Sequence, residues 1–250
     1  MAYAQSANLA GVGISPALIE FPGDPGQSYQ QSFTISNLTG SDQTYYLFLR
    51  DITEVGPGGM PIFAEEGQEL TGFELSEWVT LETTEVDVPA GGEQMVSMTI
   101  TIPPEASPGS HFGGVFVSVQ PPRMRTVGAA VAYQVANILS IRVAGEAVID
   151  ASIRQFSTSN FIYGKPEIDF TATIENAGNV LLRPTGPLEI TNMFGREVAQ
   201  LTFNESRAGV FPGSERQFAV EWIDEGPGFG RYEADLALSY GESGRQMTMA

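Results

Sequence analysis

The stretch EVDVPAGGEQMVSMTITIPP, residues 85–104, alternates apolar and polar side chains on both sides of a Pro-Ala-Gly-Gly break. Alternation with a period of two places successive side chains on opposite faces of a β-strand, and a Pro/Gly cluster interrupts a strand. We therefore expect two strands here, joined either by a hairpin turn or by a crossing from one sheet to another.

The same alternation recurs on both sides of this stretch. SYQQSFTISNLTG (28–40) ends in turn residues, Asn37 among them, and QTYYLFLRDITEV (43–55) follows as its expected antiparallel partner. AAVAYQVANILSIRV (129–143) is rich in β-branched residues, which predicts one long strand. Five or more further strands are expected between residues 148 and 242. Short strands separated by turns at intervals of roughly 8 to 12 residues indicate a β-sandwich or barrel.

The pattern restarts after Gly145, which divides the chain. We expect an all-β fold of two tandem immunoglobulin-like β-sandwiches. The first covers residues 10–146 and carries a long insertion at 56–78, and the second covers residues 147–250, about the usual length of such a domain. Residues 1–9 are expected to form a disordered tail.

The composition excludes several classes of function. Acidic residues outnumber basic ones by 30 to 12, so the net charge of −18 opposes binding to nucleic acid. The chain has no cysteine, which excludes disulfides, thiol catalysis and cysteine-based metal sites. We expect no metal and no cofactor. Only 17% of residues are charged, which is typical of extracellular β proteins that use uncharged polar surface.

The single histidine is the first residue to test for catalysis. His111 lies in PPEASPGSHFGGVFVSV (103–119), with Ser107 close by in sequence, but neither G-x-S-x-G nor H-E-x-x-H is present. Pro/Gly turns precede His111, and Gly113 and Gly114 permit a bulge or close packing. We therefore expect a strand that begins near His111, with a structural role for the histidine, and not an enzyme.

Carboxylates in the insertion leave an enzyme as the lowest-ranked hypothesis. Glu74 and Glu77 are the acidic residues that a carbohydrate-active enzyme would use here. Such chemistry needs two carboxylates across a cleft, and the sequence does not give that geometry. An acidic loop in an acidic protein is more often a solvated loop.

Aromatic residues supply the predicted binding site. Phe63 and Phe73 lie in the insertion, and Tyr45 and Tyr46 lie on the strand before it. Exposed aromatic rings stack on sugars or anchor protein partners. Trp78 is assigned to the core, because the apolar run continues after it.

The strand and turn motifs resemble a known family. SFTISN, TYYLFLRD, WVTLETTEVDVPAGGEQMVSMTITIPPEASPGSHFGGVFVSV and YQVANILSIRV, in this order, are similar to the N-terminal domain of bacterial WxL-interacting cell-surface proteins. The second unit, with TATIENAGNVLLRPTGPLEITNMFGREV, resembles the immunoglobulin-like domain that follows it. The resemblance covers about residues 10–145 for the first domain. It implies a non-catalytic surface protein that binds cell-wall polysaccharide, peptidoglycan or another surface protein.

The resemblance also implies a cellular location. We expect export by a signal peptide, with Ala2-Tyr3-Ala4 fitting a small-x-small cleavage site. The protein would then be extracellular and held at the cell surface by a C-terminal membrane anchor outside these 250 residues.

A second resemblance gives the alternative function. Periplasmic pilus chaperones are also pairs of immunoglobulin-like domains, and AYQVANILSIRV (132–143) suits strand addition to a partner. The arginine that marks those chaperones after the first strand is missing from ISPALIEF (14–21), which offers Glu20. A chaperone-like or strand-donating assembly scaffold is therefore kept as the alternative.

Overall fold

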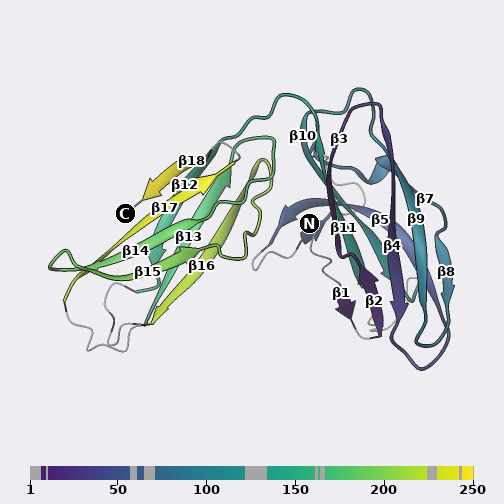
Figure 1. Cartoon of the computed structure of the whole chain (residues 1–250), viewed down its shortest axis with the longest axis horizontal. Coiled ribbons are helices and arrows are strands. Elements are labelled where there is room, and N and C mark those ends of the chain that lie inside the picture. The colour runs from purple at the N-terminus through teal and green to yellow at the C-terminus, as the bar shows by residue number, and fades with distance from the viewer. Residues whose placement is uncertain are drawn as a thin grey trace. The chain divides into compact units, whose positions relative to one another are not determined.

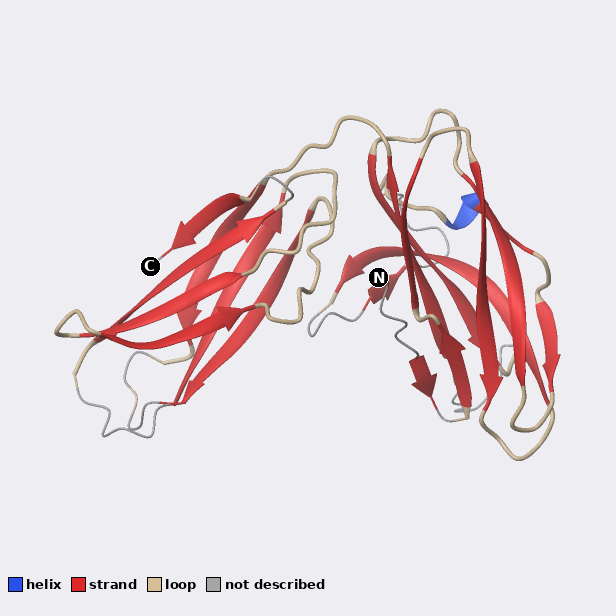
Figure 2. Cartoon of the chain, viewed as in Figure 1, coloured by secondary structure: helices blue, strands red, loops and turns tan. Residues whose placement is uncertain are grey.

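The computed structural model describes residues 7–9, 11–56, 61–64, 71–121, 134–160, 163, 167–223, 230–241 and 244–249. Their regular structure is β-strand apart from one 3₁₀ turn, η2 (Ser76–Trp78) (Figure 2). The chain divides into two compact units, residues 1–53 with 62–146, and residues 54–61 with 147–250. Within the described ranges no helical segment has the length and hydropathy needed to traverse a lipid bilayer. The predicted fold class, two tandem immunoglobulin-like β-sandwiches, is confirmed.

Two sheets form the first sandwich (Figure 1). Sheet A has the order β1 (Ala7–Leu9), β2 (Val12–Ser15), β4 (Ser28–Asn37), β9 (Glu93–Thr101) and β7 (Val79–Leu81). Sheet B has the order β3 (Leu18–Gly23), β11 (Gln134–Val143), β10 (Gly109–Ser118), β5 (Gln43–Val55) and β6 (Pro61–Phe63), and β8 (Glu85–Val88) also pairs with β5. The chain leaves sheet A for sheet B between β2 and β3, and β3 then pairs in parallel with β11.

The strand pairing corrects two expectations from the sequence and decides between the two alternatives left open at residues 89–92. β4 pairs with β2 and β9 and not with β5, because β5 belongs to the opposite sheet. The break at 89–92 is a crossing between sheets, since β8 pairs with β5 while β9 pairs with β4. Residues 7–9 are not part of a disordered tail but form β1, which pairs with β2. Of the strand expected over 129–143, the structure describes β11, and 129–133 lie outside the described residues.

Apolar side chains at alternating strand positions fill the space between sheets A and B. Inward residues of β4, β9 and β11 are buried, among them Phe33, Ile35, Ile100, Leu139 and Ile141. Complete burial of such side chains contributes roughly 1.5–3 kcal/mol each, before the entropy cost of folding. The outer face of sheet B is therefore supplied by the other set of alternating residues.

The second sandwich also consists of two sheets, with seven strands among its described residues. One sheet has the order β12 (Ala151–Thr158), β13 (Glu167–Asn176) and β16 (Ser214–Ile223). The other has the order β15 (Glu197–Phe203), β14 (Gly186–Asn192), β17 (Tyr232–Tyr240) and β18 (Arg245–Met249). It has its own core, which includes Ile174, Leu188, Phe203 and Leu238.

A buried asparagine closes the same corner in each sandwich. Asn37, at the end of β4, donates from Nδ2 to the carbonyl of Val88 at 3.0 Å. Asn176, at the end of β13, donates from Nδ2 to the carbonyl of Val210 at 2.9 Å. Both are fully buried. The prediction that Asn37 is a strand-end turn residue is confirmed.

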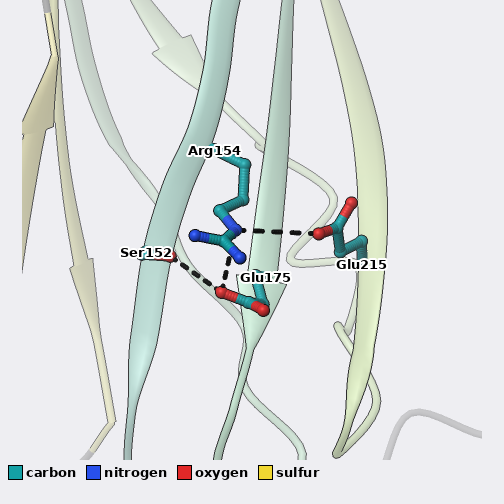
Figure 3. Close-up of polar contacts among 4 residues, drawn as sticks. All are labelled: Ser152, Arg154, Glu175 and Glu215. Atoms are coloured by element: carbon teal, nitrogen blue, oxygen red, sulfur yellow. Dashed lines mark hydrogen bonds and ion pairs between the residues drawn. The ribbon is translucent and has the colours of Figure 1, made fainter.

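An ion-pair ladder crosses the three-stranded sheet of the second sandwich (Figure 3). Arg154 Nε lies 3.0 Å from a carboxylate oxygen of Glu175 and 3.7 Å from one of Glu215, on two successive strands. The Ser152 hydroxyl donates to the same Glu175 oxygen at 3.1 Å. Because Arg154 and Glu215 are more than half exposed, the ladder is a surface feature that contributes little stability.

Candidate functional site

His111 is locked into the first sandwich. It lies in β10, its side chain is 2% exposed, and the Trp78 ring packs against it with ring centres 4.4 Å apart. Nδ1 lies 3.1 Å from the carbonyl oxygen of Glu74, and Nε2 lies 2.9 Å from that of Ser107. Both ring nitrogens therefore face backbone carbonyls, and the predicted structural role is supported by the geometry.

The neighbouring serine does not complete a catalytic triad. Ser107 Oγ lies 3.4 Å from His111 Nε2, farther than the carbonyl oxygen of the same residue. A nucleophilic system needs a carboxylate that orients the histidine from the other side, and here that position belongs to the Glu74 backbone.

The Glu74 carboxylate is used within its own turn. It accepts hydrogen bonds from the backbone N–H and hydroxyl of Thr71 and from the N–H of Gly72. Burial raises the pKa of this carboxyl, but the hydrogen bonds together lower it by more than burial raises it. The net pKa therefore lies below the usual value of a glutamate. A general acid needs the opposite shift. Among the described residues, no group of three or more His, Asp or Glu side chains is placed to hold a metal ion.

Tyr45, predicted as a binding residue, is a core residue. It is 0% exposed, and its hydroxyl donates to Asn37 Oδ1 at 3.3 Å. Burial raises the pKa of its phenol. Tyr45 is unavailable to a ligand because period-two alternation points it inward, so only its neighbour Tyr46 remains on the outer face.

Sheet B presents an aromatic cluster on that outer face. We call Tyr46, Phe48, Arg50, Phe63 and Phe116 the aromatic face. Phe48 and Phe116 are opposite each other on β5 and β10, and their rings stack at 5.3 Å with an angle of 12° between planes. Tyr46, Phe48 and Phe63 are partly exposed, Arg50 is exposed, and Phe116 is 7% exposed. Rings and one arginine at a partly exposed site resemble the composition of protein-binding hot spots.

Two glycines in β10 make room for this arrangement. A side chain at Gly114 would approach Phe63 Cε1 to 3.3 Å, whereas one at Gly113 would approach Leu75 Cγ to 3.2 Å. Gly114 therefore admits Phe63 on the outer face, and Gly113 admits Leu75 on the core side. The register of β10 with both neighbours is continuous, so the expected close packing is found and the expected bulge is not.

Phe73 is not part of the aromatic face. Its ring centre lies 6.3 Å from that of His111, and its carbonyl accepts the N–H of Phe112 at 2.8 Å. Trp78, predicted to be core, is partly buried and packs against the core from its rim. The four predicted binding residues are thus divided, with Phe63 and Tyr46 on the aromatic face, Phe73 beside the histidine and Tyr45 in the core.

Phe48, Phe116 and Arg50 were missed from the sequence. Phe48 and Arg50 were readable in principle, because the alternation that buries Tyr45 and Leu47 directs them outward. Phe116 needed the pairing of β10 with β5, which the sequence did not give.

Comparison with known proteins gives a fold likeness only. No protein-family model and no curated protein matches the chain. Among solved structures, the class 5 fimbriae chaperone CfaA is 12% identical with a TM-score of 0.47, over 95% of this chain and 97% of that one. The CupB2 chaperone of Pseudomonas aeruginosa is 12% identical with a TM-score of 0.42, over 92% and 94%. The CsuC–CsuE chaperone–tip adhesion subunit complex of Acinetobacter baumannii is matched at 12% identity and a TM-score of 0.44, over 96% and 97%. With scores this low, the fold assignment rests on the sheets themselves.

Proposed function

We propose that the chain is a non-catalytic, exported assembly scaffold that binds a protein partner by β-strand addition to the edge of β11. One observation carries the proposal. β10 pairs with β11 over its whole length, whereas β3 covers the other side only at residues 138–143. Residues 134–137, the β11 edge segment, have no described strand in register on that side.

The backbone of the edge segment is suited to a partner strand. The N–H of Ile138 donates to the carbonyl of Ala17 at 2.8 Å, so it points toward β3. Alternation along a strand then directs the N–H and carbonyl of Ala136 to the same side. Pro16 has no N–H to donate there. β1 lies beside β11, but its ladder hydrogen bonds go to β2.

The aromatic face extends this binding surface. Ala136 is opposite Phe116 on β10, and Phe116 is opposite Phe48 on β5. A partner strand at the edge would therefore lie at the end of an apolar row that runs across the sheet. Main-chain hydrogen bonds would supply affinity, and the row would supply apolar contact area.

Export and surface location are part of the proposal. The chain of 250 residues has no cysteine, and only 17% of its residues are charged. Its polar surface therefore comes largely from uncharged residues, as in many extracellular β proteins, and this supports the proposal. Membership of the WxL-interacting family is likewise a proposal, carried by turn and strand motifs alone. It would make cell-wall polymer or another surface protein the ligand.

A substitution at Ala136 tests the edge. Proline at this position removes the N–H that faces the open side but leaves the ladder with β10 intact, as in natural edge strands. Val135→Pro is the matched control for folding, since its N–H faces β10 and its loss should unfold the sandwich. We expect Ala136→Pro to fold and to lose its partner.

Photo-cross-linking in the native cells identifies the partner. A benzoyl-phenylalanine at Ala136 should give one adduct with an exported protein, and the same group at Gln200 on edge strand β15 should not. Equal adducts at both positions would contradict the proposal. Salt-resistant pelleting of the chain with purified cell walls would also contradict the proposal if Ala136→Pro left the pelleting unchanged. That result would favour wall binding.

A further inference from the structure

We infer that the aromatic face binds a partner segment that places an aspartate or glutamate side chain on Arg50. The inference rests on the proposed function, because it assigns a chemical preference to the same sheet. It is carried by the state of Arg50, a cation in a chain with 30 acidic and 12 basic residues.

Arg50 has no carboxylate partner in the part of the chain that the structure describes. Among the residues the structure describes, no Asp or Glu side chain is within ion-pair distance of its guanidinium. Its neighbour Asp51 is occupied elsewhere. That carboxylate accepts the backbone N–H of Leu75 at 3.0 Å, the backbone N–H of Ser76 at 2.7 Å and the Ser76 hydroxyl at 2.5 Å. The charge of Arg50 is therefore left for an external group.

Two aromatic rings hold this guanidinium in position. Arg50 Cζ lies 5.5 Å from the centre of the Phe48 ring and 5.6 Å from that of Phe116. Both distances are within the range of cation–π attraction. A planar guanidinium that is already placed loses less side-chain entropy when it forms a two-pronged pair with a carboxylate.

The surroundings favour a carboxylate within an apolar segment. Gly114 lies beside Arg50 in the register of β10 and β5, and Ile138 and Leu18 continue the row across β11 and β3. Leu18 is 39% exposed. A partner that covers this row excludes water from the ion pair, which strengthens the attraction.

Charge selects a single carboxylate over a polyanion. The net charge of −18 repels nucleic acid and other dense arrays of phosphate. One aspartate or glutamate brings one negative charge to Arg50, which has no described carboxylate beside it. The occupant is accordingly a protein segment with apolar residues around an acidic one.

A displayed library of 12-residue peptides, selected on the full chain, tests this assignment. Enriched peptides are synthesised with acetylated and amidated ends, so that only side-chain carboxylates remain. We expect Asp or Glu between apolar residues. Replacing that residue by its amide should weaken binding at least tenfold, Arg50→Gln should weaken it equally, and the two changes together should cost no more than either alone. Arg154→Gln, an exposed arginine of the second sandwich, is the matched control and should change nothing.

Each other outcome overturns the inference in a distinct way. Peptides whose binding falls with Phe48→Ala but not with Arg50→Gln would show that the face binds a partner without a carboxylate, which leaves the proposed function standing. Self-association of the chain that Arg50→Gln abolishes would assign the carboxylate to a second copy. Peptides that bind the Phe48→Ala, Arg50→Gln double variant as well as the wild type would exclude the face altogether, while cross-linking at Ala136 would still decide the proposed function.

Discussion

Phe63 meets Phe116 edge to face, with ring centres 4.4 Å apart, and the backbone of Gly114 lies next to both rings. This contact joins the insertion before η2 to the outer face of sheet B. It gives Phe63 a place in a surface made by three strands, and it makes that surface sensitive to a single glycine.

Substitution of Gly114 by valine should destabilise the first sandwich by about 1–3 kcal/mol, because the new side chain meets Phe63 and Phe116 where space is short. The backbone of Gly114 is not in the left-handed region, so the cost comes from packing alone. Urea denaturation measures it. Gly40→Ala is the control, since nothing lies within 4 Å of a side chain there, and an equal loss for both would refute the packing argument.

The two corner asparagines predict separate losses of stability. Asn37→Ala removes hydrogen bonds to the carbonyls of Ser41, Val88 and Pro89 and should cost about 2–4 kcal/mol in the first sandwich. Calorimetry should show a lowered transition for that sandwich while the other transition keeps its temperature.

Asn176→Ala should do the reverse, because it removes the hydrogen bonds to Val180 and Val210 in the second sandwich. Gln30→Ala, an exposed side chain with one hydrogen bond, is the control and should change stability by less than about 0.5 kcal/mol. A loss in both transitions from either asparagine would mean that the sandwiches unfold as one unit.

Glu74→Gln should reveal a pH-dependent contribution from the 71–74 turn. The folded pKa of Glu74 lies below its unfolded value, so the ionised carboxylate stabilises the fold above the unfolded pKa, and this stability is lost as the pH falls through the folded pKa. We expect the wild type to exceed the variant by about 1 kcal/mol at pH 7.

The difference should shrink as the pH falls below about 4.5, the usual range of a glutamate. Equilibrium unfolding at several pH values measures it, with Glu77→Gln as a control from the same segment. A difference that grows on acidification would contradict the hydrogen-bonding account.

Arg154→Gln should cost less than about 1 kcal/mol, because Arg154, which makes the ion pairs with Glu175 and Glu215, is more than half exposed. The cost should disappear in 1 M salt, where the screening length is only about 3 Å. A loss of several kcal/mol, or a loss that persists in high salt, would contradict the conclusion that the ladder contributes little stability.

Much of the strand content followed from local pattern. The ranges 28–37 and 43–55 were readable because each alternates apolar and polar residues between turn signals, and they became β4 and β5. The turn role of Asn37 and the structural role of His111 were also readable, from flanking turn residues and missing catalytic motifs. Pairing was not, since alternation is a property of one strand and does not name its neighbour. That is why β4 and β5 were wrongly expected to pair.

The candidate site, like the fold, was predicted only in part from local sequence pattern. The sequence predicted aromatic residues around the insertion, and Phe63 and Tyr46 do lie on the outer face of sheet B. Tyr45 was wrong by one residue, because the choice between neighbours on a strand depends on which face meets the other sheet. Phe116 joined the site only when β10 was placed beside β5.

By itself, the sequence determined that this chain is all-β, that it divides near residue 146, and that catalysis by thiol or histidine triad is unsupported. These follow from period-two hydrophobicity, turn chemistry and residue types, which are local. Only the tertiary structure decided that β3 stops short of the start of β11, that Gly114 admits Phe63, and that Arg50 lies over the rings of Phe48 and Phe116. These depend on contacts between residues far apart in the chain, and such contacts are fixed by the packing of whole sheets.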